Sequence, residues 1–379
     1  MTQMQAAPTT KLNDCPGLRE YVTLGRSGLR VSPLCLGAMT FGQEWGIGED
    51  EATSVKVIDR YLELGGNFID TANGYNKGHS EAILGSHLSG VPSKRDRVVI
   101  ATKWMSNLYR NDPNGGGGHR KAITESVEQS LRRLKTDYID LLWMHFWDKW
   151  TPIEETMRTL DDLVRAGKVR YLGFSDTPAW VCAQAQMIAQ FRAWSPLIAL
   201  QIEYSLVERT VEADLIAMAQ SLGMGVTPWS PLKGGILTGK YTRSSAPAGA
   251  RYKADSKHLN ERTFRIVDEL KNIAAGHKTQ QGQATVAQVA LAWVRQRAGV
   301  ASTIIGARNT GQLEANLASL EVTLNAREMA SLDETSEPAL PFPHGFLSFV
   351  KDAIQNGASV NGLASNVWPY SPADDDERW

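Results

Sequence analysis

Residues 67–75 read Asn-Phe-Ile-Asp-Thr-Ala-Asn-Gly-Tyr, a short apolar run that ends abruptly in a carboxylate, Asp70, and is followed by a phenol, Tyr75. The run lacks polar alternation, which is typical of a strand buried on both faces of a parallel sheet. Comparable runs recur along the chain, at residues 34–37, 67–70, 98–103, 138–145, 169–174, 197–202, 224–229 and 303–306. We therefore predict eight buried, parallel strands.

The segments between these runs carry apolar residues at helical spacing. Four sets are clear: Ile123, Val127, Leu131 and Leu134; Ile153, Met157, Leu160 and Val164; Val286, Val289, Ala290, Trp293 and Val294; and Leu313, Leu317 and Leu320. Repeated strand–helix units predict an α/β fold, and eight of them favour a (β/α)8 TIM barrel over an open sheet.

Polar side chains at the ends of the runs also favour a barrel. Five of them can do chemistry, namely Asp70, Lys103, His145, Ser175 and Gln201. A barrel brings the carboxyl ends of all its strands to one shared mouth, whereas an open doubly wound sheet concentrates functional residues at one crevice. The spread over five strands favours the barrel.

Three segments fall outside the repeat. Residues 21–32, with Gly25 and Gly28 as turn residues, predict a hairpin that plugs the barrel bottom. Residues 232–260 follow the seventh strand and predict a lid loop, and residues 114–118 predict a flexible loop before a helix. We expect a single domain over residues 1–379, with a core of about 21–337 and a C-terminal tail, 338–379, to which the sequence assigns no role.

Composition excludes several classes of protein. Lys and Arg total 40 against 41 for Asp and Glu, a net charge of -1 that gives no reason to expect nucleic acid or an anionic membrane as partner. No run of apolar residues is long enough for a membrane span, and residues 1–13 lack the apolar core of a signal peptide. Cys15, Cys35 and Cys182 form neither a disulfide framework nor a CxxC pair. We expect a reduced, cytoplasmic protein, with a homo-oligomer left open.

Several cofactor and metal motifs are missing. No G-x-G-x-x-G joins a strand to a helix, so the usual dinucleotide-binding fold has no support. Residues 234–240 match the spacing of a phosphate loop, but Tyr241 follows where Ser or Thr would hold magnesium. The seven histidines show no metal-ligand spacing, so we predict no metal site.

Four stretches of the chain, however, resemble the aldo-keto reductase family. They are residues 67–75, quoted above; V-I-A-T-K at 99–103; D-L-L-W-M-H at 140–145; and G-K-V-R-Y-L-G-F-S-D at 167–176. The likeness runs from about residue 21 to 316 and is closest to the branch of aryl-alcohol dehydrogenases and potassium-channel β subunits. It implies Tyr75 as the proton donor, with Asp70, Lys103 and His145 beside it, NADPH/NADP+ as cofactor, and a small-molecule carbonyl or alcohol as substrate.

The chemistry of these four residues supports that implication. Carbonyl reduction needs a hydride on carbon and a proton on oxygen, and an ordinary tyrosine pKa near ~10 is too high for ready proton exchange at neutral pH. An ammonium at Lys103 favours the phenolate, so we predict a lowered pKa for Tyr75, with Asp70 pairing the buried charge. His145 would donate to the substrate oxygen. Taken singly, the four could instead be a structural ion pair, a loop aromatic and a core histidine.

The resemblance also implies a cofactor site. Ser175 and Gln201 would hydrogen-bond the nicotinamide carboxamide, and Tyr204 would stack beneath the ring. The loop after the seventh strand would close over the pyrophosphate, through Trp229, Ser230, Leu232, Gly234, Leu237 and Lys240. The start of the last helix would bind the adenosine end, through Gly306, Arg308, Gln312 and Asn316. Arg308 there suits a 2′-phosphate at a helix N-terminus, although an ordinary surface helix is the alternative.

Two residues depart from the family pattern. Asp176 stands where asparagine is usual, and a carboxylate can accept from the carboxamide but cannot donate to its oxygen. Lys233 stands where a small residue is usual and would add charge near the pyrophosphate.

Aromatic residues follow three of the predicted strands. Trp45, Trp104, Phe146 and Trp147 are predicted to wall a pocket for flat or ring-bearing substrates, although some of these rings could merely pack loops onto the barrel rim.

The sequence leaves two functions open: a reductase or dehydrogenase, and a cofactor-bound regulatory or redox-sensing subunit of a partner protein.

Overall fold

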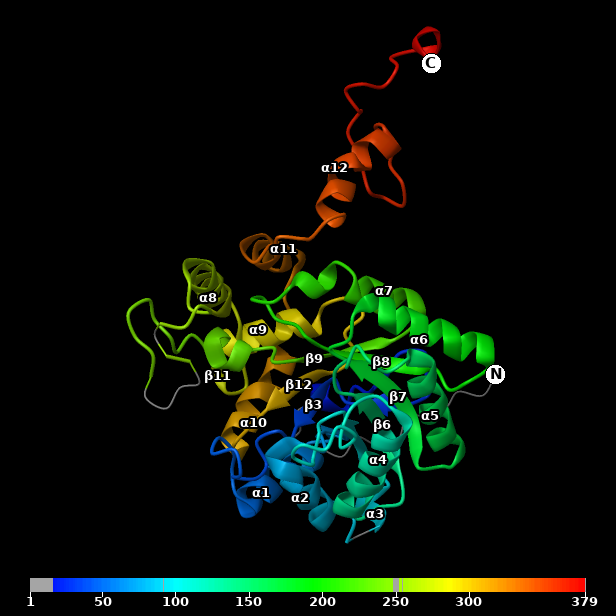
Figure 1. Ribbon diagram of the computed structural model, residues 1–379. Helices are drawn as coiled ribbons and strands as arrows, with labels where there is room; N and C mark the ends of the chain where they lie inside the picture. The colour runs from blue at the N-terminus through cyan, green and yellow to red at the C-terminus, as the bar shows by residue number, and fades with distance from the viewer. Residues whose placement is uncertain (1–15, 91, 248–251, 254, 379) are drawn as a thin grey trace, which may run out of the picture. The chain divides into compact units, whose positions relative to one another are not determined.

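The computed structural model describes residues 16–90, 92–247, 252–253 and 255–378 (Figure 1). The polar N-terminal segment 1–13 and Cys15 lie outside these residues. The chain divides into two compact units between Glu337 and Pro338.

The first unit is built around a parallel sheet of eight strands within the described residues, in the order β12-β3-β4-β5-β6-β7-β8-β9. The strands are β3 (Leu34–Gly37), β4 (Phe68–Asp70), β5 (Val99–Trp104), β6 (Ile139–Met144), β7 (Val169–Ser175), β8 (Leu197–Glu203), β9 (Gly225–Trp229) and β12 (Thr303–Gly306). Each strand begins and ends within one residue of a predicted run. The prediction of eight buried parallel strands is therefore confirmed.

The two edges of this sheet meet just before β12. The amide of Val226 in β9 donates to the carbonyl of Gly299 at 2.9 Å, and the amide of Ala301 donates back to the carbonyl of Val226 at 2.8 Å. On the other side, the amide of Thr303 donates to the carbonyl of Pro33 at 3.0 Å. The sheet thus curls into a nearly closed barrel, as the (β/α)8 prediction requires.

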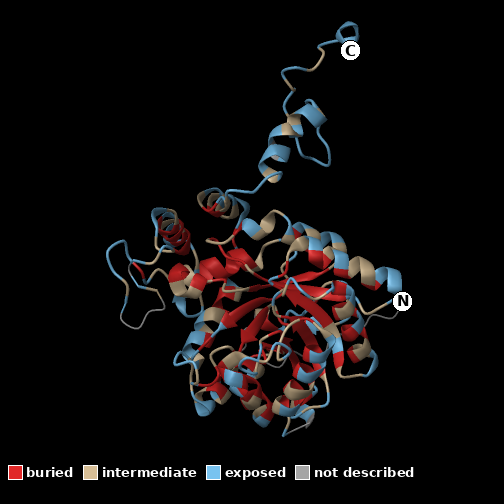
Figure 2. Ribbon diagram, in the orientation of Figure 1, coloured by how far each residue is buried: buried red, intermediate tan, exposed pale blue. Residues whose placement is uncertain are grey.

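Helices surround the barrel and cover the outer face of its strands (Figures 1 and 2). They are α1 (Glu51–Glu63), α2 (His79–Leu88), α3 (Pro92–Arg95), α4 (Arg120–Leu134), α5 (Ile153–Arg165), α6 (Ala179–Arg192), α7 (Leu215–Leu222), α8 (Glu261–Ala274), α9 (Val286–Arg295), α10 (Thr310–Leu317) and α11 (Ala326–Thr335). The predicted stripes fall on α4, α5, α9 and α10, except that Leu320 lies in the 3-10 turn η5 (Ala318–Glu321) after α10; most of their residues are buried.

Successive residues of each strand belong to two separate apolar clusters. In β5, Val99 and Ala101 pack inside the barrel, whereas Ile100 between them packs against the helices. This period of two follows from the pleat of a strand, which sends alternate side chains to opposite faces. It decides which residues at the strand ends enter the barrel mouth and which face the helical layer.

A short hairpin closes the barrel floor. Its strands β1 (Val22–Thr23) and β2 (Arg30–Val31) pair antiparallel. Leu24 and Val31 are fully buried within the interior cluster of the barrel, as predicted for a plug. Gly25 has φ +59°, and a Cβ there would collide with the carbonyl oxygen of Ile198. Glycine is therefore required at this turn.

The second unit, residues 338–379, contains α12 (His344–Gln355) and a short loop held by aromatic contacts. Phe349 and Tyr370 each contact Trp368 with ring centroids 5.7 Å apart.

None of the helices within the described residues has the length and apolar character needed to cross a bilayer.

The barrel interior gives a sharp packing test at Gly173 in β7. A Cβ at this position would overlap the indole ring of Trp143, which is fully buried in the neighbouring strand β6. We expect Gly173→Ala to lower the free energy of unfolding by roughly 1–3 kcal/mol, the usual cost of overpacking a core. Gly28→Ala is the matched control, because a Cβ at Gly28 meets no atom within 4 Å. Urea unfolding measures both, and equal stabilities for the two variants would contradict the interior packing described here.

Candidate active site

Four side chains meet where β4, β5 and β6 end. Asp70 is the last residue of β4, Lys103 lies one residue before the end of β5, and His145 directly follows β6. Tyr75 begins the 3-10 turn η2 (Tyr75–Gly78), five residues beyond Asp70. The pleat of β5 places Lys103 on the same side as Ala101, inside the barrel. The predicted cluster is therefore assembled in space.

Lys103 is the centre of this cluster. Its ammonium donates to the carboxylate of Asp70, to the carbonyl of Thr71 at 2.8 Å and to the hydroxyl of Tyr75 at 3.3 Å. The same Nζ lies 4.9 Å from the centroid of the Tyr75 ring. Both Lys103 and Asp70 are buried. Burial lowers the pKa of Lys103, but Asp70 and Tyr75 together outweigh burial and raise this pKa, so the ammonium stays charged.

The phenol of Tyr75 stays neutral. Burial raises the pKa of Tyr75, and the Lys103 ammonium lowers it by less than burial raises it. The predicted lowering of this pKa is therefore wrong in direction, because the site removes water from the phenol and also places the Asp70 carboxylate nearby. At neutral pH the hydroxyl retains the proton that a donor needs.

His145 is also held neutral. Burial, and then the Lys103 ammonium, lower the pKa of His145 to about 3. Its ring contacts the edge of the Tyr75 ring, with centroids 5.7 Å apart. The Nδ1 atom is buried and has no hydrogen-bond partner among the described residues. A neutral imidazole donates from one nitrogen, so this ring can hold a substrate oxygen near the phenol without adding charge.

The mouth continues across β7, β8 and β9. Ser175 pairs in register with Gln201, and the Gln201 amide donates to Asp70 Oδ2 at 3.0 Å. Asp176 has φ +40° and accepts from the indole Nε1 of Trp229 at 3.0 Å. Loss of hydration in the mouth raises the pKa of Asp176 to about 6, although the residue keeps an exposed face. Trp229 is partly exposed beside it.

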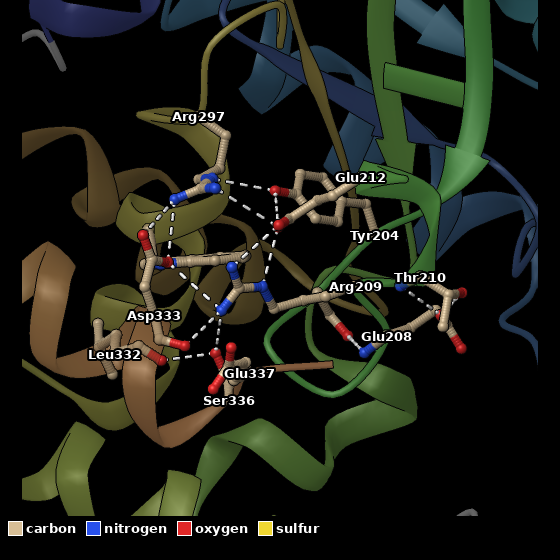
Figure 3. Close-up of polar contacts among 12 residues, drawn as sticks. Tyr204, Glu208, Arg209, Thr210, Glu212, Arg297, Leu332, Asp333, Ser336 and Glu337 are labelled. Atoms are coloured by element: carbon tan, nitrogen blue, oxygen red, sulfur yellow. Dashed lines mark hydrogen bonds and ion pairs between the residues drawn. The ribbon is translucent and has the colours of Figure 1, made fainter. Parts of the chain in front are cut away.

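Tyr204 does not lie where the sequence predicted. Its ring is fully buried and packs against Trp293 of α9, with centroids 5.4 Å apart. Its hydroxyl donates to Glu212 at 2.6 Å and accepts from Arg297 at 3.0 Å (Figure 3). The ring offers no open face to a ligand, so stacking beneath a nicotinamide is contradicted. The cause is the pleat of the strand, which sends alternate side chains to opposite faces. Gln201 and Glu203 face the mouth, so Tyr204, the next residue, points away from it.

Tyr204 belongs instead to a partly buried ionic network that joins α11 to the barrel (Figure 3). Arg297 contacts both carboxylate oxygens of Asp333, at 2.9 and 2.7 Å. Arg209 donates to Glu212 and to the carbonyl of Asp333. These contacts fix the C-terminal end of the barrel unit and contain no residue of the cluster around Lys103.

The loop after β9 forms a compact turn, η4 (Lys233–Thr238), in which Gly234 and Gly235 have φ +58° and +93°. Ser230, which has φ +53°, and Leu232 are partly exposed before it, whereas Leu237 is buried and Lys240 is exposed. Lys233 is buried and pairs with Glu203 at 2.6 Å. Its charge is therefore already neutralised by the protein.

The N-terminus of α10 lies directly beyond β12. Asn309 caps the helix by accepting from the amide of Gln312 at 2.9 Å, and Gln312 in turn accepts from the amide of Arg308 at 3.0 Å. Asn316 donates to the carbonyl of Gly306 at 3.1 Å. The Arg308 side chain is more than half exposed, with its Nε 3.9 Å from Glu49. This geometry leaves a cationic group available to an anion.

Aromatic residues line one side of the mouth, but only part of the predicted wall is present. Trp45 stands edge-on to Tyr75 with centroids 5.8 Å apart, and Phe146 lies 5.2 Å from the ring of His145. Trp147 packs against Trp180 of α6. Trp104 is buried among residues that face the helices, because it directly follows the inward-facing Lys103. Its assignment to the substrate pocket is therefore wrong.

Asn76 is a residue of the site region that the sequence did not single out. It directly follows Tyr75, is fully buried, and bonds the loop that carries Trp45. Its only signal in the sequence is its place directly after the quoted motif, which ends at Tyr75.

Among the described residues no cluster of His, Cys, Asp and Glu is arranged to hold a metal ion.

Known proteins match this chain over most of its length. The family model described as Aldo/keto reductase family matches residues 33–337. A norsolorinic acid reductase of Aspergillus flavus is 36% identical, over 91% of this chain and 87% of the relative. A putative aryl-alcohol dehydrogenase of Saccharomyces cerevisiae is 35% identical, over 84% and 86%. An uncharacterized oxidoreductase of Bacillus subtilis is 37% identical, over 83% and 95%.

The buried ion pair at the centre of the cluster predicts a specific pattern of stability. Lys103→Met leaves the Asp70 carboxylate buried without its cation, so we expect a loss of about 3–5 kcal/mol in the free energy of unfolding. The double variant Asp70→Asn/Lys103→Met removes both charges and should recover most of that loss. Chemical denaturation measures all three proteins. A double variant no more stable than Lys103→Met would refute the pairing as the source of the effect.

Proposed function

Because the chain belongs to the aldo/keto reductase family, we propose that it is an NADPH-dependent oxidoreductase that interconverts ring-bearing aldehydes or ketones and their alcohols, with Tyr75 as general acid and base. The observation that carries the proposal is the contact of the Tyr75 hydroxyl with the buried Lys103 ammonium, 3.3 Å away, beside Asp70 and His145. Family membership makes the chain an oxidoreductase that acts on carbonyl or alcohol groups. The cofactor, the roles of individual residues and the substrate class are the proposal.

Proton transfer is the task of Tyr75. A bound NADPH would supply the hydride for reduction. In that direction the neutral phenol of Tyr75 gives its proton to the developing alkoxide. Lys103 then stabilises the phenolate that remains, through its charge 3.3 Å from the oxygen. In the direction of oxidation the same phenolate accepts the proton of the alcohol. The pair therefore serves both directions with one proton.

His145 has the task of holding the substrate oxygen. Its neutral ring lies at the edge of the Tyr75 ring, so a donor nitrogen and the phenol hydroxyl can converge on one oxygen atom. A neutral donor suits this position because a second cation beside Lys103 would be repelled, which is one reason that the pKa of His145 is low. Orientation of this kind raises the rate by fixing the reacting atoms before the hydride moves.

The residues around the mouth fit an NADP cofactor. Trp229 offers a partly exposed ring, held by Asp176, and is better placed than Tyr204 to contact a nicotinamide. Ser175 and Gln201 supply polar groups on the neighbouring strand ends. The glycine turn in η4, together with Ser230, Leu232, Leu237 and Lys240, suits the pyrophosphate, because backbone amides in such turns bind anions. Gly306, Arg308, Gln312 and Asn316 suit the adenosine 2′-phosphate.

The substrate class follows from the aromatic wall. Trp45 and Phe146 are 43% and 42% exposed and flank Tyr75 and His145, so an apolar ring placed there would be covered on two sides. The names of the relatives, a norsolorinic acid reductase and a putative aryl-alcohol dehydrogenase, support a ring-bearing substrate. Burial of such a ring contributes about 25 cal/mol per Å² of apolar surface.

Replacement of Tyr75 tests the acid–base assignment. We expect Tyr75→Phe to reduce kcat for aromatic aldehydes by at least about 10²-fold, the lower end of general acid catalysis, while the Kd for NADPH stays within a factor of about two. Stopped-flow reduction and fluorescence titration with NADPH measure the two quantities. Turnover equal to the wild type would remove Tyr75 from the mechanism. A wild type that binds NADPH yet reduces no carbonyl would favour the regulatory-subunit alternative.

Replacement of Arg308 tests the cofactor preference. A charge-assisted contact to a phosphate contributes roughly 1.5–3 kcal/mol, so we expect the wild type to bind NADPH about ten- to a hundredfold more tightly than NADH. Arg308→Ala should remove most of this difference by weakening NADPH alone. Arg243→Ala is the matched control, because Arg243 is also a half-exposed arginine but pairs with Glu261. Equal Kd values for the two cofactors in the wild type would overturn the assignment.

A further inference from the structure

We propose that Asn76 is a positioning residue that sets the preference for ring-bearing substrates by holding Trp45 against the edge of Tyr75. The inference rests on the proposed function and adds a residue and a role to it. Asn76 is fully buried, so it acts on a substrate only through the loop that it anchors.

The side chain of Asn76 makes three hydrogen bonds, all to the backbone of the loop between β3 and α1. Its Oδ1 accepts from the amide of Trp45 at 3.1 Å. Its Nδ2 donates to the carbonyl of Met39 at 2.9 Å and to that of Phe41 at 3.1 Å. A carboxamide is one of the few side-chain groups that can accept at one atom and donate twice at the other. Asn76 therefore fastens the loop at both ends of the segment 39–45.

The backbone of Asn76 explains why this residue can reach the loop. Asn76 has φ +46° and ψ +45°, in the left-handed region that asparagine tolerates better than most residues with a side chain. This conformation follows immediately after Tyr75 and sends the two side chains in different directions. Tyr75 enters the mouth beside Lys103, whereas Asn76 turns beneath the loop.

Two consecutive residues thus control both the phenol and the aromatic wall beside it. Trp45 is partly exposed and lies with its ring at 76° to that of Tyr75, so it stands beside the phenol that a substrate oxygen would meet. Packing beneath the loop supports the same anchor, since a Cβ added at Gly42 would touch the Cβ of Asn76 at 3.0 Å. The position of Trp45 relative to the reacting group is consequently fixed from inside the protein.

A second attachment of the loop is weaker. Glu44 pairs with His79, and the His79 side chain is 61% exposed. Exposed ion pairs contribute little and are screened by salt. Asn76, which accepts from the amide of Trp45 itself, is therefore the stronger of these two attachments.

The test is a double-variant cycle at Asn76 and Trp45. Asn76→Gly keeps the left-handed backbone and removes all three hydrogen bonds, and Trp45→Ala removes the wall. Lys77→Gly is the matched control, because Lys77 has φ +57° in the same turn but an exposed side chain. The four proteins of the cycle and the control are assayed with NADPH and either benzaldehyde or propanal, and kcat and KM are determined separately.

We expect Asn76→Gly to lower kcat/KM for benzaldehyde about tenfold, mainly through KM, with a much smaller effect on propanal. In the Trp45→Ala background the same change should have little further effect, since the wall is already absent. Lys77→Gly should retain the wild-type selectivity. Should Asn76→Gly fail to fold, Asn76→Asp, which keeps the acceptor for Trp45 but loses both donors, is expected to shift selectivity in the same direction.

The outcomes separate the inference from the proposed function. If the wild type reduces both aldehydes and Asn76→Gly or Asn76→Asp lowers their kcat/KM values equally, the inference is wrong and the proposed function stands. Additive effects of Asn76→Gly and Trp45→Ala on benzaldehyde would also overturn it, because Asn76 would then act by another route. Failure of the wild type to reduce either aldehyde would defeat both proposals.

Discussion

The buried ammonium of Lys103 is the group on which the arrangement of the barrel mouth depends. A charge without access to water costs several kcal/mol unless it is paired and hydrogen-bonded, and here the partners come from β4 and the turn after it. Asp70 supplies the charge, and Thr71 and Tyr75 supply oxygen atoms. The register of β4 and β5 and the position of Tyr75 are therefore consequences of one requirement. Gln201, from β8, satisfies the remaining Asp70 oxygen and extends the cluster across the barrel.

Much of this could be predicted from the sequence. The strands were recognisable because residues buried on both faces cannot alternate with polar ones, and the polar residues that end the runs mark the mouth. Pairing of Lys103 with Asp70 also followed from elementary electrostatics, since a buried lysine needs a carboxylate nearby. The plug formed by Leu24 and Val31 was predictable from its turn glycines and its place before the first barrel strand.

Other features depend on the direction in which a side chain points or on the balance of opposing effects on a pKa. The sequence alone does not give either of these. Trp104 and Tyr204 both point outward by the two-residue period of a strand, a rule that could have excluded Trp104 because its neighbour Lys103 faces inward. The pKa of Tyr75 is set by competition between burial, which raises it, and a nearby ammonium, which lowers it. The direction of the net shift depends on how deeply the phenol is buried, which the sequence does not show. The role proposed for Asn76 depends on a left-handed turn that neither the apolar periodicity nor the motifs of the sequence reveal.

The central claim is that Tyr75, held neutral beside a charged Lys103, is the proton donor. The pH dependence of the single-turnover rate of carbonyl reduction at saturating NADPH tests it most directly. The pKa of Tyr75 is raised above its ordinary value of 10.0 and that of His145 is lowered to about 3, so the account predicts a rate that is flat from about pH 7 to 9. A rate that falls about tenfold per pH unit over this range, as a histidine donor of ordinary pKa requires, would contradict it.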